Sequence, residues 1–405
     1  MFVAPQLTPG EAVAQHPVTA YTLTPEQLHK AEGLHRTRTV LMISDAVLGL
    51  LFMLVLIGGR VAPRLERWAR GISGKRFVQA LVYFPAILLL LGVAELPLLI
   101  YGHHVALDYG LSVQGWGSWA GDWMKGQAIS LLLFTPVLAG IYRLMERSPR
   151  RWWWYGWLIS LPIILTLVFL APVVIDPLYN HFEPLAKTNP ELTRQLQSLA
   201  HSAGLEIPES RIFLMHASEK VTTYNAYVTG LGATKRIVVW DNTARDMTLG
   251  QTLFVFGHET GHYVLHHIYK GMAFSFVLSF IGFLLTKLLA DWSIARYGKS
   301  WQVAAPSAWG SLPVLLLIAS LLSFFGSPLT SAYSRSIEHE ADCYGLALTS
   351  HITPDSGQVA AQSFQLLGEK SYSYPAPSSL MVFWTYSHPP ISDRVRFALE
   401  HPAGR

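Results

Sequence analysis

The sequence is short of charged residues and almost free of cysteine, and each shortage excludes a class of protein. Asp, Glu, Lys and Arg make up only 14% of the 405 residues, whereas soluble domains carry about 25%. The chain has one cysteine, Cys343, which excludes an internal disulfide framework and a metal site built from several cysteines. Any metal site must therefore use histidine and carboxylate ligands.

Signals for nucleic-acid binding and for secretion are also missing. The formal net charge is only +4, and no tract combines basic with aromatic residues, so we expect no nucleic-acid partner. Residues 1–20 lack a basic start followed by an apolar core, so we expect no secretory signal peptide there.

What the sequence has in abundance is apolar residues, at 51%. They are concentrated in six stretches, each close to the length of about 20 residues that a helix needs to cross a bilayer. Tryptophans lie beside arginines at residues 150–154, as is typical of membrane interfaces. We therefore predict a multi-pass α-helical membrane protein in a lipid bilayer. The six predicted spans are residues 39–58, 78–101, 127–144, 153–175, 272–290 and 311–333.

Between the fourth and fifth spans the composition is that of a globular protein. Asn189 and Pro190 are typical of a helix start, and strand-like alternation follows at 211–217 and again on both sides of a Gly-containing turn near 231–233. A further helix is predicted from Thr248, in a capping box with Gln251, to a stop near Gly271. This pattern predicts a small α+β region.

The last of these helices contains the motif H-E-x-x-H at residues 258–262. Residues four apart lie on one helical face, so His258 and His262 can bind one ion while Glu259 reaches a water on it. A Zn²⁺ held by three protein groups keeps an open position for that water. Glu259 would take a proton from the water as it attacks a peptide carbonyl and pass the proton to the leaving amine. The motif predicts metal-assisted amide hydrolysis.

Two nearby patterns could supply a third ligand. Metzincins have a glycine and a further histidine in the positions that Leu265 and Ile268 occupy here, so that pattern is excluded. His266 and His267 follow one turn later. Either is an alternative ligand, although a polar helix end at the membrane surface also explains both.

A better third ligand lies after the sixth span, in residues 334–345. Glu338 and Asp342 are four residues apart on one helical face. One of them can bind the metal while the other orients a ligand histidine. Glu340 lies on the other side of the same helix, so we do not expect it to share that role.

The order of these motifs resembles the type 1 CAAX prenyl protease family of integral-membrane zinc endopeptidases. H-E-x-x-H is followed by a membrane helix pair and then by E-x-x-A-D, and the similarity extends from about residue 75 to 397. Further segments that resemble the family are 171–185, 225–230, 235–241 and 387–394. The resemblance implies one Zn²⁺ per chain bound by His258, His262 and Glu338, with Glu259 as catalytic residue and Asp342 as supporting aspartate.

The resemblance also implies substrate contacts. Asn225, Ala226 and Tyr227 match a segment along the substrate groove of that family, and an exposed strand edge can bind a peptide through main-chain hydrogen bonds. Without the resemblance, this segment is an ordinary hairpin. His388 and Arg394 match residues that approach the metal in the family, where they could stabilise the oxyanion. A barrel of helices around a water-filled chamber is implied as well.

We therefore predict a membrane zinc metalloendopeptidase that hydrolyses peptides or proteins, with prenylated CAAX proteins as the substrates that the family name implies. Six spans, where eukaryotic members have seven, favour a bacterial homologue in the inner (cell) membrane; a eukaryotic protein would lie in the endoplasmic reticulum membrane. Two alternatives stay open. One is a heat-shock-type membrane quality-control metalloprotease, and the other is a transporter or scaffold with a structural metal site.

Two basic loops, at 59–77 and 143–151, belong in the cytoplasm by the positive-inside rule, which places the globular region outside. The eukaryotic relatives imply the opposite orientation. The sequence does not indicate the oligomeric state.

The sequence divides into five predicted regions. They are a polar segment 1–38, a four-span membrane region 39–175, a catalytic region 176–271, a membrane helix pair 272–333 and a C-terminal segment 334–405 with the third zinc ligand.

Overall fold

The computed structural model describes residues 17–230 and 234–401. The first part of the predicted polar segment and the predicted hairpin turn at 231–233 lie outside these ranges. Within them, six helices are long and apolar enough to cross a membrane, which confirms the predicted number. These helices are α2 (Pro25–Gly58), α4 (Arg76–Asp108), α5 (Trp116–Arg147), α6 (Trp152–Leu170), α11 (His267–Trp301) and α12 (Leu312–Thr349).

Helix α2 begins earlier than its predicted span. Thr24 accepts a hydrogen bond from the backbone of Gln27, and the Gln27 side chain accepts one from the backbone of Thr24, which completes a capping box in front of Pro25. The last part of the predicted polar segment, up to residue 38, is therefore the polar start of the first long helix.

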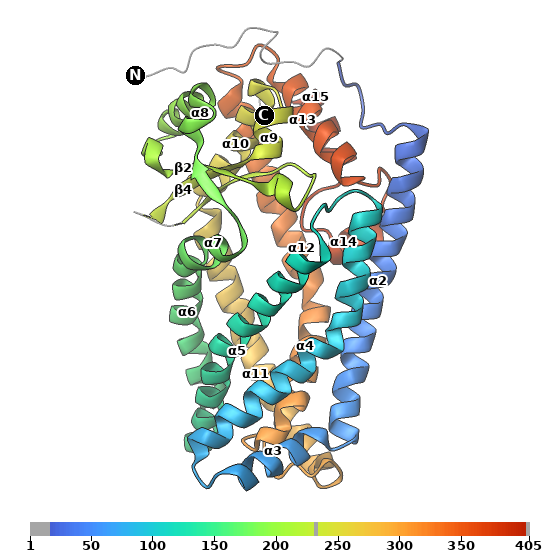
Figure 1. The fold of residues 1–405 in the computed structure, drawn as a ribbon, viewed down its shortest axis with the longest axis vertical. Helices are drawn as coiled ribbons and strands as arrows, with labels where there is room; N and C mark the ends of the chain where they lie inside the picture. The colour runs from blue at the N-terminus through green and yellow to red at the C-terminus, as the bar shows by residue number, and fades with distance from the viewer. Residues whose placement is uncertain (1–16, 231–233, 402–405) are drawn as a thin grey trace.

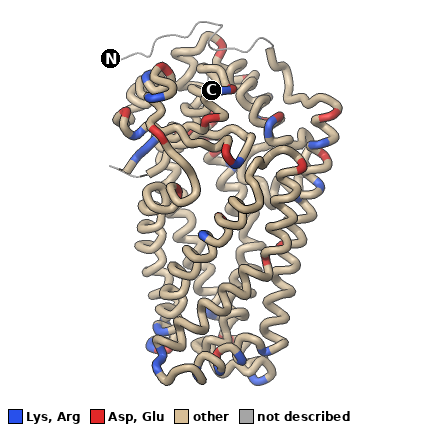
Figure 2. The backbone as a smooth tube through the Cα atoms, viewed as in Figure 1, with Lys and Arg blue, Asp and Glu red and all other residues tan. Residues whose placement is uncertain are grey.

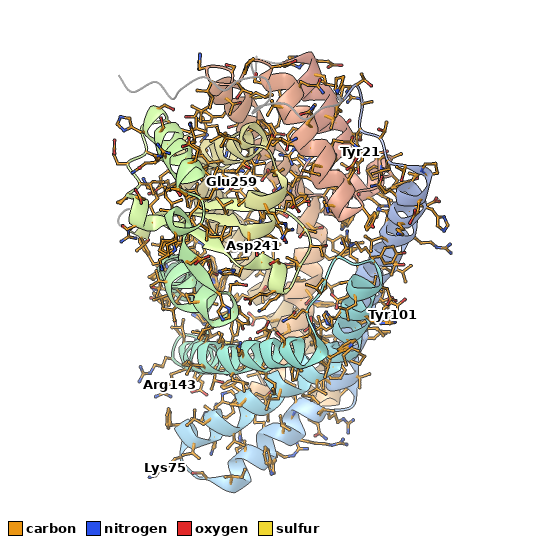
Figure 3. All side chains as sticks on the ribbon, turned by 45° about the horizontal axis from the view of Figure 1, so that its top comes forward. Tyr21, Lys75, Tyr101, Arg143, Asp241 and Glu259 are labelled. Atoms are coloured by element: carbon orange, nitrogen blue, oxygen red, sulfur yellow. The ribbon has the colours of Figure 1, made fainter. Side chains whose placement is uncertain are left out.

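Helices α2, α6, α11 and α12 run roughly along one axis, α4 and α5 run obliquely to it, and the sheet lies at one end of the bundle (Figure 1). At the other end, α3 (Val61–Ile72) crosses the bundle, and Tyr83, Phe84, Tyr142 and Trp309 form an aromatic core. Lys and Arg gather at this end (Figure 2). Lys75 and Arg143 lie there, far from Glu259 (Figure 3). The basic loops are thus on the opposite side of the bundle from the globular region.

The globular region contains a mixed four-stranded sheet in the order β1-β2-β4-β3. Strand β4 pairs in parallel with β2 and antiparallel with β3, which confirms the predicted hairpin pairing and leaves β3 at an edge. Asn189 caps α8 (Pro190–Ser202) as predicted. The strands are β1 (Phe182–Pro184), β2 (Ile212–Met215), β3 (Ala226–Thr229) and β4 (Arg236–Trp240).

Helix α10 (Leu249–Val264) begins at the predicted capping box of Thr248 and Gln251, but the prediction of one helix to Gly271 was wrong. His266 adopts a left-handed backbone conformation with φ of 60°, so the chain turns and α11 begins at His267. A shared apolar core joins α8, the sheet, α10 and α13. The remaining helices are α7 (Asp176–Tyr179), α9 (Asp241–Asp246), α13 (Ser356–Ser371), α14 (Ser379–Thr385) and α15 (Ile391–Glu400).

Candidate metal centre

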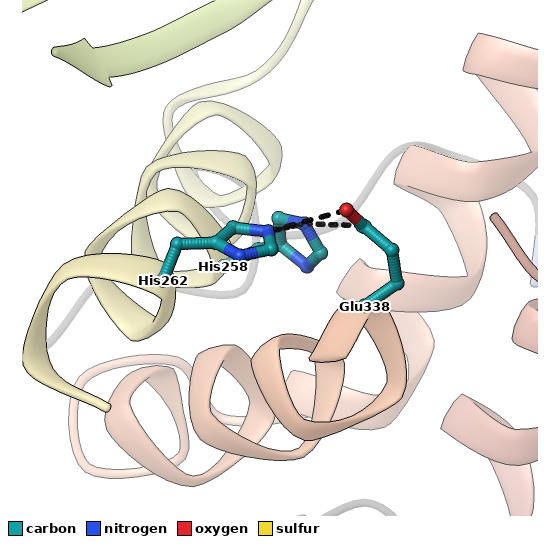
Figure 4. A group of neighbouring side chains, drawn as sticks. All are labelled: His258, His262 and Glu338. Carbon is teal, nitrogen blue, oxygen red and sulfur yellow. Dashed lines mark hydrogen bonds and ion pairs between the residues drawn. The ribbon is translucent and has the colours of Figure 1, made fainter. Parts of the chain in front are cut away.

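Three side chains from two helices converge at one point (Figure 4). His258 and His262 extend from α10, and Glu338 extends from α12. The two Nε2 atoms lie 3.2 Å apart, and the Glu338 carboxylate lies 3.2 Å from His258 Nε2 and 3.5 Å from His262 Nε2. The structure thus brings together the three residues that the sequence predicted as ligands.

The separations suit a metal ion better than they suit contacts among the three side chains. Ligand atoms about 2.0–2.1 Å from one tetrahedral Zn²⁺ lie about 3.3 Å apart, which is close to the separations observed here. Glu338 Oε2 is buried and accepts no hydrogen bond of regular geometry from the described residues, although imidazole nitrogens of His258 and His388 lie 3.2 and 3.3 Å from it. Such an atom is costly unless it has a partner, and a divalent cation would supply one. The residues present therefore fit a metal.

The two helices approach closely enough for this because glycines lie between them. A Cβ atom on Gly345 of α12 would lie 2.8 Å from the backbone nitrogen of His258, and one on Gly261 of α10 would lie 3.1 Å from the Cβ of Tyr344. Hydrogen side chains at these positions let the backbones come into contact. This contact sets the distance between the imidazoles and the carboxylate.

A buried ion-pair network holds His258 from behind. Its Nδ1 lies 2.8 Å from Asp342 Oδ1, and Asp342 is only 1% exposed. Arg394 of α15 donates two hydrogen bonds to the same carboxylate, at 2.6 and 2.8 Å. Burial alone would lower the pKa of His258, but the carboxylates of Asp342 and Glu338 outweigh it and raise that pKa to about 9.

Two family models match this chain: residues 186–402 match peptidase family M48, and residues 13–181 match the CAAX prenyl protease N-terminal model of five membrane helices. The uncharacterized metalloprotease YhfN of Bacillus subtilis is 35% identical over 376 residues, 93% of this chain and 86% of that protein. The chain belongs to peptidase family M48. It is a multi-pass membrane metalloprotease.

Two other proteins share less sequence identity with this M48 metalloprotease. CAAX prenyl protease 1 of Saccharomyces cerevisiae is 25% identical over 404 residues, 94% of this chain and 87% of that protein. The crystal structure of S. mikatae Ste24p superposes with a TM-score of 0.78 at 23% identity, over 93% of this chain and 89% of that one. The superposition shows that the two proteins share a fold.

Beside the ligands, the M48 metalloprotease has a cavity of about 310 Å³, and Glu259 lines it together with His262 and Glu338. The rest of its wall is mostly apolar. Burial raises the pKa of Glu259 above its usual range, which makes this carboxylate a stronger base once it is ionised. The apolar part of the wall comes from Val228, Tyr263, Ile268 and Ile337.

The residues predicted to contact substrate lie at the start of edge strand β3. Asn225 is exposed, Ala226 is buried in the core, and Tyr227 packs on the other face of the sheet near Met215. Val228 follows Ala226 on the same face, as alternation along a strand requires, and it lines the cavity. Sequence analysis missed Val228, although that alternation could have indicated it.

His388 and Arg394, the two predicted site residues of the C-terminal segment, have different partners in the structure. His388 Nε2 lies 3.3 Å from Glu338 Oε2, and its side chain is 55% exposed, so it borders the metal ligands. Arg394 is engaged with Asp342 instead and lies over the ring of Phe364. His267, named from the sequence as an alternative metal ligand, contacts His262 from the start of α11 and is not one of the three converging side chains.

Proposed function

We propose that this M48 metalloprotease is a zinc endopeptidase that cleaves peptide or protein substrates at the membrane. The supporting observation is the convergence of His258, His262 and Glu338 at separations that suit Zn²⁺, with Glu259 on the wall of the adjoining cavity. The donor set is two imidazoles and one carboxylate, and the adjoining cavity leaves one side of the site open. Both features are those of a catalytic zinc site rather than of a closed structural one.

In the proposed mechanism, a Zn²⁺ held by these three residues would supply Lewis-acid activation of water and of the scissile carbonyl. Glu259 takes the proton from the attacking water and delivers it to the leaving amine. Exposed His388, beside Glu338, donates a hydrogen bond to the developing oxyanion. Arg394 acts indirectly, because it holds Asp342, which holds His258.

We further propose that the substrate binds as an added strand along β3. This strand pairs with β4 on one side only within the described residues, so its other edge offers main-chain groups to an extended peptide, starting near Asn225. Ala226 and Tyr227 would contribute backbone only, because their side chains face the protein interior. The apolar wall at Val228 and Ile337 would accept an apolar substrate side chain beside the cleaved bond.

Prenylated CAAX proteins are the more specific substrate candidate, since the name of the yeast relative states that activity. The match of residues 13–181 to the CAAX prenyl protease N-terminal model favours this type over a heat-shock-type protease. Identity of 35% to a Bacillus subtilis protein supports a location in a bacterial cell membrane, and for a bacterial enzyme we propose unmodified apolar peptides as the main substrates.

The test compares wild type with Glu259→Gln in purified full-length protein. Glutamine keeps the shape of the side chain but cannot accept the proton, so we expect the cleavage rate of quenched apolar and farnesylated peptides to fall about 10²- to 10⁴-fold. Bound zinc, measured by atomic absorption, should stay at one per chain in both proteins. Equal cleavage by the two proteins would refute Glu259 as the base, and wild type without zinc would refute the metal assignment.

A further inference from the structure

The junction between α10 and α11 places a third histidine against the metal centre. In a continuous helix, residue 267 would lie about 140° around the axis from residue 262, so the two side chains would point apart. The left-handed conformation of His266 breaks the helix and turns His267 back toward His262. A left-handed residue other than glycine costs about 1–2 kcal/mol, and at His266 this conformation creates the contact between His267 and His262.

His267 forms a bridge between a metal ligand and a carboxylate. Its Nδ1 lies 3.0 Å from Nδ1 of His262, and its Nε2 lies 3.1 Å from Oε2 of Glu340. His267 is 3% exposed, so its contact with His262 is shielded from water, whereas the Glu340 side chain is 48% exposed. Glu340, on α12, also lies 3.8 Å from Nζ of Lys270. Sequence analysis excluded Glu340 from a supporting role, and the bridge through His267 is what that reasoning missed.

The hydrogen-bond chain determines which nitrogen of His267 and which nitrogen of His262 carries the proton. Glu340 accepts from Nε2–H of His267, which leaves Nδ1 of a neutral His267 as an acceptor for Nδ1–H of His262. The Nε2 lone pair of His262 then faces Glu338 and the other imidazole. His258 has the same arrangement, because its Nδ1 faces Asp342. Both ligand imidazoles are therefore fixed through Nδ1 by a carboxylate of α12, one directly and one through His267.

We propose that His267 is a positioning residue, which holds the tautomer and the ring orientation of His262 for metal binding and is itself held by Glu340. The proposal rests on the zinc site proposed above. Partners of this kind typically change metal affinity by 10- to 100-fold when they are removed. Because His267 is not one of the three side chains whose ligand atoms converge, its removal should weaken zinc binding without abolishing it.

The test measures zinc affinity in full-length protein in detergent, by competition with a chromogenic chelator. We expect His267→Leu to bind zinc about 10- to 100-fold more weakly than wild type. His267→Asn should lie closer to wild type, because its amide oxygen replaces Nδ1 as the acceptor for His262. Glu340→Ala, which removes the acceptor for Nε2–H of His267 at a half-exposed side chain, should weaken binding without disturbing the fold. His266→Asn, one residue away, should bind as wild type does.

The order of the variants separates positioning from packing. Leucine fills a buried site better than asparagine does, so a packing role predicts that His267→Leu binds zinc better than His267→Asn. That order would overturn the proposal, as would wild-type affinity in His267→Leu or in Glu340→Ala. Melting of the metal-free proteins, followed by circular dichroism, shows whether each variant is folded. Failure of wild type to bind zinc would instead refute the metal site on which the proposal rests.

Discussion

Substitution of Gly345 by alanine tests whether the close approach of α10 and α12 sets the metal centre. The new methyl group would lie 2.8 Å from the backbone nitrogen of His258 and 3.1 Å from its Cα. Both neighbours are backbone atoms, so neither can rotate away. Reaching the lower limit of ordinary contact, 3.4 Å, requires the helices to separate by about 0.6 Å (3.4 − 2.8).

That separation moves the carboxylate of Glu338 away from the two imidazoles. Metal–ligand distances tolerate about ±0.2 Å, so an opening of about 0.6 Å cannot be absorbed without strain. Overpacking of this kind costs about 1–3 kcal/mol, which corresponds to about 5- to 150-fold weaker zinc binding. The metal-free protein should be affected less, because alanine is favoured over glycine within a helix by about 0.5–1 kcal/mol.

The assay compares Gly345→Ala with Gly257→Ala in the chelator competition described above. Gly257 lies in the same helix contact, but its added methyl group would meet its nearest neighbours at 3.4 Å, an ordinary distance. We expect Gly257→Ala to bind zinc as wild type does. If Gly345→Ala also bound zinc with wild-type affinity while remaining folded, the helix contact would not control the site and the reasoning would be wrong.

Two further predictions concern protons and membrane orientation. The carboxylates beside His258 raise its pKa to about 9 in the metal-free protein. Zinc binding near pH 7.5 should therefore release about one proton, and zinc affinity should rise about tenfold per pH unit up to pH 9. Calorimetry in buffers of different ionisation enthalpy measures the proton release. Since this pKa lies above the ordinary value of 6.5, the charged imidazole should stabilise the metal-free fold fully below pH 6.5, and thermal melting should show this contribution lost by pH 9. The positive-inside rule puts the basic end of the bundle in the cytoplasm, so exposed Glu206→Cys in a Cys343→Ala background should react with an impermeant maleimide in intact cells; protection until lysis would contradict that orientation.

The sequence was sufficient to predict the three converging side chains because H-E-x-x-H and E-x-x-A-D are local patterns. Spacing along a helix fixes which side chains share a face, whatever surrounds the helix. Hydropathy was sufficient to predict the six long helices, because it too is a local property of the sequence. It missed the polar start of α2, although Thr24, Pro25 and Gln27 carry a capping signal that could have indicated it.

What the sequence could not predict depends on contacts between distant segments. No glycine or proline marks the break at His266, and Gly271 offered a more typical helix end. The role of Glu340 was excluded by its angle on α12, but that angle says nothing about a side chain arriving from another helix. Arg394 likewise reaches Asp342 across 52 residues of sequence, a pairing that only the folded chain creates.

Helix α12 is continuous from Leu312, in the aromatic core at the basic end, to Glu338 and Asp342 at the metal centre. These points are about 40 Å apart along a single rod. The start of the rod packs in the aromatic core at the basic end, whereas the two imidazoles belong to the globular region. We therefore expect a bilayer thickness that tilts α12 to shift the carboxylate relative to the imidazoles, so that zinc affinity should vary with lipid acyl-chain length.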